Sequence, residues 1–244
     1  MAVPGPLHLR PTAELAERAL LPGDPGRALL LAQALLQEPR MFNHHRGLWG
    51  YTGTASDGGA LTVQSTGMGG PSAAIVLEEL ADLGLRRAIR VGSCGALDER
   101  LALAELVVAE RALADDGASR ALAAADTLAA DPELTVALRE AAAPSVSGLV
   151  ASTDLFYDPR PRTAERWRKA GAAAVEMEAA ALFAVGHRRG VAVACVLVVS
   201  DLLFAQPGRP GRGRRRISDK GLAGASEGAA RHAARALAVP AIAG

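Results

Sequence analysis

The sequence predicts an α/β fold that forms a single domain. Short apolar segments run into glycine-rich turns at 19–27, 60–72 and 87–95, and the first two turns lead into helices. A fourth apolar segment, 191–199, contains no charged residue, which is typical of a strand buried on both faces. Strands that alternate with helices in this way indicate an α/β architecture. Because no internal repeat or linker divides the 244 residues, we expect one domain over 1–244.

Composition excludes several classes of protein. The net charge is only +1, which argues against a nucleic-acid partner. Cys94 and Cys195 are too few for a disulfide framework or a cysteine zinc site, and His44 and His45 are not spaced as a metal pair with nearby carboxylates. No apolar run reaches the roughly 20 residues of a membrane span, and the N-terminus lacks a signal-peptide pattern. We expect a cytoplasmic protein with no metal and no membrane or nucleic-acid partner.

The elements of the first half follow from apolar periodicity and turn residues. Thr12, after Pro11, is a good N-cap for a helix over 12–18. The apolar segment 19–21 is expected to be a strand, because a glycine-rich turn and the start of a helix follow it. The same reasoning predicts further elements: a helix at 25–36, strands at 48–54 and 60–65 joined by the turn 56–59, a helix at 72–83 and a strand from 87.

The second half is predicted in the same way. Asp131 as N-cap and Pro132 in the first turn indicate a helix within the alanine-rich segment 113–143. The remaining expected elements are strands at 106–109, 147–152, 172–175 and 191–199, and helices at 163–169, 179–189 and 219–238. The segment 206–216 is a loop rich in proline, glycine and arginine, and it could close over an anionic substrate.

Two glutamates lie where the strand 172–175 gives way to a helix. Glu176 and Glu178 stand on either side of Met177 in an otherwise apolar run. A buried carboxylate is costly unless something pairs with it, and ligands bind at strand ends in open α/β sheets. The pair therefore suggests a polar ligand with an apolar face, such as a sugar ring. The alternative is a surface helix start, where the helix dipole favours glutamate.

Two arginines indicate an anion site. The turn at 19–27 leaves backbone N–H groups at a helix start, and Arg27 in the first helical turn opposes the dipole unless an anion lies there. Arg90 lies inside an apolar strand beside glycines that let a ligand approach the backbone. A buried guanidinium needs an anion. The alternative for Arg90 is a pair with one of the protein's own carboxylates.

Three further positions are candidates for chemistry. Ser200 and Asp201 end the apolar strand 191–199, so Asp201 could be a proton donor; helix capping is the alternative. Phe156 and Tyr157 follow a strand, where an aromatic ring could stack on a planar base or simply join the core. Cys94 invites a role as nucleophile, but no base is near it in sequence, so we expect it to pack.

Five segments in this order resemble the nucleoside phosphorylase family that contains hexameric purine nucleoside phosphorylases and uridine phosphorylases. They are LPGDPGR at 21–27, GMGGPS at 67–72, RVGSCGA at 90–96, VEMEA at 175–179 and SD at 200–201. The resemblance covers nearly the whole chain. It implies a single domain with a mixed, partly barrel-like central sheet flanked by helices. It also implies phosphorolysis, in which phosphate attacks C1′ of a nucleoside and the base leaves, with no cofactor beyond phosphate as co-substrate.

The resemblance also implies residue roles. The phosphate-binding residues would be Gly23, Arg27, Arg90 and Ser93 of one subunit, with Arg46 from a neighbouring subunit. The nucleoside-binding residues would be His8, which reaches the ribose 5′-hydroxyl across the same interface, with Met68, Phe156, Glu176, Met177, Glu178 and Ser200. Asp201 would protonate N7 of the leaving purine, assisted by an arginine that is Arg214 by ungapped count, with Arg212, Arg215 and Arg216 nearby.

Rival activities stay open at this point. Hydrolases of the same superfamily lack the phosphate arginines. Uridine phosphorylases resemble the chain at 67–72 and 78–81, but they read the pyrimidine with a glutamine and an arginine where Arg160 and Arg162 stand here. They also lack an equivalent of Asp201, so purine nucleosides are favoured, with uridine and then 5′-methylthioadenosine as alternatives. A non-catalytic nucleoside sensor would not need the full phosphate and ribose set. If His8 and Arg46 act across an interface, the protein is at least a dimer, and the family suggests a hexamer.

Overall fold

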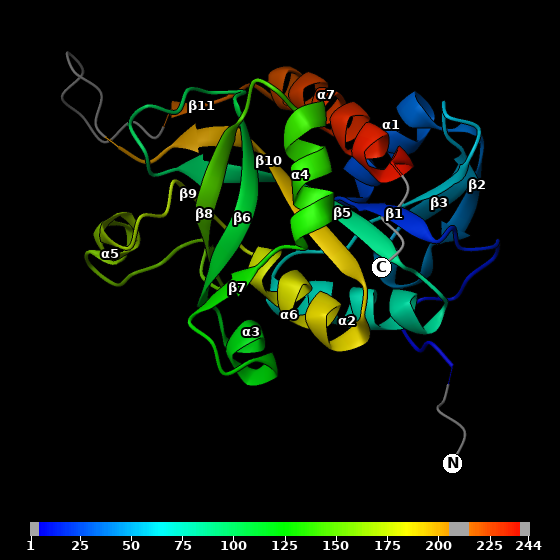
Figure 1. Ribbon diagram of the computed structural model, residues 1–244, viewed down its shortest axis with the longest axis horizontal. Coiled ribbons are helices and arrows are strands. Elements are labelled where there is room, and N and C mark those ends of the chain that lie inside the picture. Colours follow the sequence, from blue (N-terminus) through cyan, green and yellow to red (C-terminus); the bar gives the residue numbers. More distant parts are fainter. Residues whose placement is uncertain (1–4, 205–214, 240–244) are drawn as a thin grey trace.

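The computed structural model describes residues 5–204 and 215–239, and all strands of these ranges belong to one eleven-stranded sheet (Figure 1). The strands are β1 (Arg18–Leu21), β2 (Gln37–Asn43), β3 (Gly50–Thr54), β4 (Ala60–Gln64), β5 (Arg87–Ala96), β6 (Leu106–Asp115), β7 (Thr127–Ala129), β8 (Val146–Thr153), β9 (Ala174–Glu176), β10 (Ala192–Leu202) and β11 (Arg215–Arg216). The helices are α1 (Pro25–Leu35), α2 (Gly70–Asp82), α3 (Gly117–Leu122), α4 (Pro132–Ala141), α5 (Thr163–Lys169), α6 (Ala179–Arg189) and α7 (Asp219–Ala238), with a short 3-10 turn, η1, at His45–Gly47.

The sheet is mixed and partly closed. Its order is β11-β10-β6-β8-β9-β5-β1-β4-β3-β2, with β7 beside β6. Because β5 also pairs with β10, the strands β10, β6, β8, β9 and β5 form a closed ring. The strands β4, β1, β5 and β10 are parallel neighbours, whereas β6 runs antiparallel to β10. The predicted α/β class with a mixed, partly barrel-like sheet flanked by helices is confirmed.

Two hydrophobic cores lie on opposite faces of the sheet. Side chains alternate along β10, so Ala194, Val196 and Val198 pack in one core while Cys195 and Leu197 pack in the other. The first core is covered by α1, α4 and α7, and the second by α2 and α6, as the ribbon shows (Figure 1). Burial on both faces explains why β10 is apolar from Ala192 to Val199, as predicted for the segment 191–199.

Asp131 caps α4 as its position before Pro132 predicts. Its carboxylate accepts a hydrogen bond of 2.8 Å from the Leu134 backbone N–H. We expect Asp131→Ala to lower the free energy of unfolding by about 1 kcal/mol, because one helix-end N–H loses its partner. Urea unfolding measures this loss. Glu140→Ala, at the exposed opposite end of α4, is the control and should change stability by less than about 0.5 kcal/mol. Equal effects of the two substitutions would contradict the capping role.

The helix predicted over 12–18 is wrong. None of its residues is helical, because the segment is irregular until β1 begins at Arg18. The Thr12 N–H donates to the Phe42 carbonyl at 2.8 Å, and the Thr12 hydroxyl donates to the Met41 carbonyl at 2.7 Å. The strand that offers these carbonyls, β2, was not predicted. Its first five residues are exposed and show no alternation of apolar and polar side chains. Contacts between distant segments therefore outweigh the local helix signal of Thr12.

Two further predictions concern residues 200–216. The capping alternative for Ser200 and Asp201 is wrong, because both lie inside β10. Of the predicted loop 206–216, residues 206–214 lie outside the described ranges, while Arg215 and Arg216 form β11 beside Asp201 and Leu202. Within residues 5–204 and 215–239, no helix is long and apolar enough to cross a bilayer.

Candidate active site

A cavity of about 1280 Å³ lies at the C-terminal ends of the parallel strands β1, β4, β5 and β10. This is the edge where open α/β sheets bind ligands. Eleven of the predicted site residues line it: Gly23, Arg27, Met68, Arg90, Ser93, Phe156, Glu176, Met177, Glu178, Ser200 and Asp201. The segments that the sequence singled out separately therefore meet in one place.

Arg90 joins the two glutamates of the β9–α6 junction. Its Nε lies 3.0 Å from Glu176 Oε2 and its Nη2 lies 2.5 Å from Glu178 Oε2. The alternative reading of Arg90, a pair with the protein's own carboxylates, is thus what the structure shows. Burial alone would lower the pKa of Arg90, but Glu178 and then Glu176 outweigh it and raise this pKa above its usual value. The two contacts use only part of the guanidinium's N–H donors, so Arg90 can also bind an anion.

Glu176 is held by the protein on several sides. Its carboxylate accepts from the backbone N–H groups of Glu178 and Ala179 at 2.9 Å each and from the Ser152 hydroxyl. The Glu176 side chain is fully buried, and these donors together with Arg90 hold its carboxylate at the start of α6. The surface-helix alternative for Glu176 and Glu178 is wrong. The contact predicted between Glu176 and the nucleoside stays a prediction, and the geometry favours a supporting role for this side chain.

Glu178 faces the cavity, and its carboxylate is held by Arg90 and by the backbone of Gly69. Its Oε1 accepts from the Gly69 backbone N–H at 2.6 Å, while Oε2 pairs with Arg90. Gly69 has a φ of +87°, in the region that favours glycine, which lets its N–H point across to α6. Burial raises the pKa of the Glu178 carboxyl, and Arg90 opposes this rise. Since an arginine keeps its charge in proteins, the pair holds a carboxylate acceptor at the cavity wall.

Arg27 also lines the cavity, as do Arg90 and Arg215. Burial and the neighbouring charge of Arg90 lower its pKa, while Asp24 and Glu178 oppose this shift. The Asp24 carboxylate caps α1 and accepts from the Arg27 backbone N–H at 2.6 Å. This capping bond was not predicted, and it occupies one of the N–H groups that the turn was expected to offer to an anion. An anion here can also be held by guanidinium groups, because arginine side chains line the same cavity.

Asp201 is buried at an irregular point of β10. The pairing register between β10 and β5 shifts between Val199 and Asp201, which marks a β-bulge at Ser200. Bulges re-aim side chains and are common beside active sites. The Ser200 hydroxyl lies 2.8 Å from Asp201 Oδ2 and 3.1 Å from the Cys94 carbonyl oxygen. The β-bulge thus allows the Asp201 carboxyl group to line the cavity, where a proton donor was predicted.

Aromatic side chains line part of the cavity. Phe156 lies in the loop between β8 and α5, is 50% exposed, and meets Tyr157 edge to face with ring centroids 5.0 Å apart. The core alternative for this pair is wrong, because Tyr157 is exposed as well. Trp167 and Phe204 also line the cavity but were not predicted. A tryptophan inside the predicted helix 163–169 of so aromatic-poor a chain was the one available signal.

Cys94 lines the cavity but packs as predicted. The residue is buried, and burial raises the pKa of its thiol, so that the thiolate needed for nucleophilic attack is disfavoured. Cys94 and Cys195 are both unbonded cysteines. Among the described residues, no three His, Cys, Asp or Glu side chains gather as metal ligands would.

Two predicted residues lie outside the cavity and a third lies outside the described residues. His8 Nδ1 is 2.7 Å from Glu79 Oε1, and Arg46 is exposed in a left-handed conformation within η1. These two residues share one surface, because His45 Nδ1 lies 3.0 Å from the His8 carbonyl oxygen. They are the residues that were predicted to serve a neighbouring subunit. Arg214 falls in the range 205–214, outside the described residues.

Known proteins resemble this chain over most of its length. The sequence profile of the phosphorylase superfamily matches residues 17–238. The purine nucleoside phosphorylase DeoD-type of Clostridium beijerinckii is 36% identical over 199 residues, covering 78% of this chain and 83% of the relative. That of Geobacillus kaustophilus is 37% identical over 198 residues, covering 78% and 83%. A crystal structure of uridine phosphorylase from Vibrio fischeri superposes with a TM-score of 0.82 at 29% identity, covering 92% of each chain. The chain belongs to the phosphorylase superfamily.

Proposed function

We propose that this protein catalyses phosphorolysis of the N-glycosidic bond of purine ribonucleosides and deoxyribonucleosides, releasing the free base and ribose 1-phosphate or deoxyribose 1-phosphate. The observation that carries this proposal is the meeting of three kinds of group in one cavity. Arg27 and Arg90 can hold an anion, Glu178 presents a carboxylate that can accept from hydroxyl groups, and Asp201 lies buried where it can donate a proton. Its similarity to enzymes named purine nucleoside phosphorylases supports the same reaction.

The proposed chemistry follows from the placement of charge. Glycosyl transfer passes through an oxocarbenium-like state with positive charge at C1′. Phosphate held by Arg27 and Arg90, with Gly23 and Ser93 beside it, stabilises this charge and attacks C1′. Glu178 orients the ribose through its hydroxyl groups. As the bond from C1′ to the base breaks, the electron pair goes to the base, and Asp201 donates a proton to N7.

Uridine is the second candidate substrate, favoured by the structural similarity to uridine phosphorylase from Vibrio fischeri. Two observations support purine instead. Asp201 suits a base with an N7 to protonate, which pyrimidines lack. Arg160 is held by Asp158 through contacts of 2.8 Å from Nε and 2.7 Å from Nη2, so its guanidinium is engaged within the loop that carries it. The resemblance places the pyrimidine-reading glutamine of uridine phosphorylases at the position of Arg160, so that glutamine is missing here.

The test is release of free base from inosine, adenosine, 5′-methylthioadenosine and uridine, each with and without phosphate. The proposal expects phosphate-dependent release of hypoxanthine or adenine. Phosphate-dependent release of uracil alone would replace purine by pyrimidine and remove Asp201 from the reaction. Release that does not depend on phosphate would contradict the roles of Arg27 and Arg90.

Arg27→Gln is expected to raise KM for phosphate by at least about tenfold while leaving the stability of the fold almost unchanged. Burial and the nearby Arg90 disfavour the Arg27 charge when no anion compensates it, so its removal relieves an unfavourable interaction. Initial rates at varied phosphate and urea unfolding measure the two effects. The matched control is Arg100→Gln, which removes an exposed guanidinium paired with Asp98 outside the cavity. An unchanged KM for phosphate in Arg27→Gln would contradict the assignment.

The proposal extends to the whole protein. We propose that residues 1–244 act as one cytoplasmic domain in purine salvage or nucleoside catabolism, with phosphate as co-substrate and no cofactor. We also propose a homo-oligomer, a dimer-based hexamer, in which His8 and Arg46 complete a neighbour's site. Exposed apolar side chains near these residues, Leu7, Met41 and Trp49, support an interface there. Sedimentation velocity measures the assembly, and a fully active monomer would contradict this part.

A further inference from the structure

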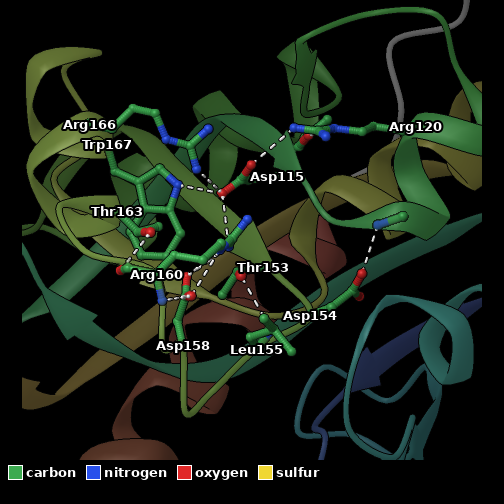
Figure 2. Close-up of polar contacts among 12 residues, drawn as sticks. Asp115, Arg120, Thr153, Asp154, Leu155, Asp158, Arg160, Thr163, Arg166 and Trp167 are labelled. Carbon is green, nitrogen blue, oxygen red and sulfur yellow. Dashed lines mark hydrogen bonds and ion pairs between the residues drawn. The ribbon is translucent and has the colours of Figure 1, made fainter.

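Asp115 gathers an unusual number of donors around one carboxylate. It is the last residue of β6, and its side chain is only 7% exposed. Its Oδ1 lies 3.0 Å from Arg120 Nη2, while its Oδ2 accepts from Arg166 Nη2 at 2.6 Å and Trp167 Nε1 at 2.9 Å. A fourth donor, Arg160 Nη2, lies 3.8 Å from Oδ2. Figure 2 shows these groups converging on Asp115 from α3, from α5 and from the loop before α5.

The donors tie Asp115 to the loop that carries Phe156. At the start of this loop, Asp154 Oδ2 accepts a 2.8 Å hydrogen bond from the Gly117 N–H, two residues after Asp115. Near its end, Arg160 reaches toward Asp115 and also accepts, through its carbonyl, a 3.2 Å bond from the Thr163 hydroxyl. The β6–α3 junction therefore holds the start of the loop through Asp154 and holds α5, which follows the loop, through the bonds of Arg166 and Trp167 to Asp115 (Figure 2). A loop fixed at both ends presents its middle residue in a defined position.

Trp167 connects Asp115 to the cavity directly. Its indole lines the cavity and packs in a small core with Leu97, Leu149 and Ala151. The ring N–H must point away from this apolar cluster to a hydrogen-bond acceptor, and Asp115 provides it. The orientation of one cavity wall is thus set by a carboxylate that does not itself line the cavity.

We propose that Asp115 is the positioning residue for the part of the cavity wall formed by Trp167 and Phe156, where the base is expected to stack. It acts through its bond to Trp167 and through the loop that carries Phe156. The inference rests on the proposed function and adds to it a residue that recognises the base indirectly. Phosphate binding depends on Arg27 and Arg90, which lie on other elements and make no contact with this network. Loss of Asp115 should therefore affect the nucleoside and leave phosphate almost unaffected.

The experiment measures both Michaelis constants in Asp115→Asn with the nucleoside that the wild-type protein cleaves best. We expect KM for the nucleoside to rise about tenfold and KM for phosphate to stay within about twofold. Trp167→Phe keeps an aromatic ring but removes the donor to Asp115 together with part of the ring volume, so the same selective rise is expected if Asp115→Asn fails to fold. The matched control is Asp57→Asn, which loses a bidentate pair with Arg18 far from the cavity and should change neither constant.

The outcomes separate this inference from the proposed function. An active wild-type protein whose nucleoside KM is the same in Asp115→Asn would overturn the inference alone. So would a parallel rise of both Michaelis constants with a fall in melting temperature, because that result indicates a general structural role. A wild-type protein that releases no base in the presence of phosphate would contradict the proposed function itself.

Discussion

Asp201→Asn is expected to lower kcat for inosine by about 10²- to 10⁴-fold while the protein keeps its fold. The asparagine side chain has the same shape, so the β-bulge at Ser200 and the hydrogen bond from its hydroxyl can persist. It cannot donate the acidic proton that N7 of the leaving purine requires. Steady-state rates with inosine at saturating phosphate measure the loss, and urea unfolding checks that the fold is intact.

A second substrate makes the Asp201 prediction specific. Any residual cleavage of uridine should be nearly the same in wild type and Asp201→Asn, because a pyrimidine has no N7 to protonate. Asp98→Asn, which disturbs a surface pair with Arg100, is the control and should leave inosine cleavage unchanged. Wild-type kcat for inosine in Asp201→Asn would contradict the role of Asp201 as general acid.

Arg90→Met is expected to lower the free energy of unfolding by about 3–5 kcal/mol and to abolish phosphate-dependent cleavage. The substitution leaves the buried carboxylates of Glu176 and Glu178 without their cation. A buried carboxylate without a partner destabilises the fold by more than the complete ion pair stabilises it. Urea unfolding at neutral pH measures the loss, and Arg27→Gln, which should leave stability almost unchanged, is the comparison.

The stability deficit of Arg90→Met should depend on pH in a defined direction. Burial already raises the pKa of Glu178, and losing Arg90 removes the interaction that opposes this rise. A carboxyl group with a raised pKa in the folded state takes up a proton more readily than in the unfolded chain, so it destabilises the fold as the pH rises. The difference between Arg90→Met and wild type should therefore shrink as the pH is lowered from 7 toward the ordinary pKa of glutamate. A deficit that grows on acidification would contradict this account.

Local patterns in the sequence predicted the elements that carry strong signals. Asp131 and Pro132 marked the start of α4, and the unbroken apolar run at 191–199 marked β10. The edge strand β2 could not be predicted in this way, since its exposed residues carry no alternation. The closure of the sheet through the β5–β10 pairing also left no local trace, because it joins segments about a hundred residues apart. That feature came from the resemblance to a family.

The candidate site shows the same division. Residue types and glycine turns identified Arg27, Arg90 and Asp201, and the structure brings them to one cavity. The sequence left open whether Arg90 serves a ligand or the protein's own carboxylates, and its position between Glu176 and Glu178 allows both. The anchoring role proposed for Asp115 could not be predicted, because its donors Arg166 and Trp167 come from a segment about fifty residues away that only the fold brings to it.

The central claim is that two arginines make phosphate the nucleophile in this cavity. Phosphorus-31 NMR of the protein with inosine and inorganic phosphate tests it most directly, because the sugar product is identified by its bond to phosphorus. The account predicts ribose 1-phosphate appearing in step with hypoxanthine, and no hypoxanthine when phosphate is omitted. Free ribose with hypoxanthine and no phosphate ester would show that water is the nucleophile and would contradict the account.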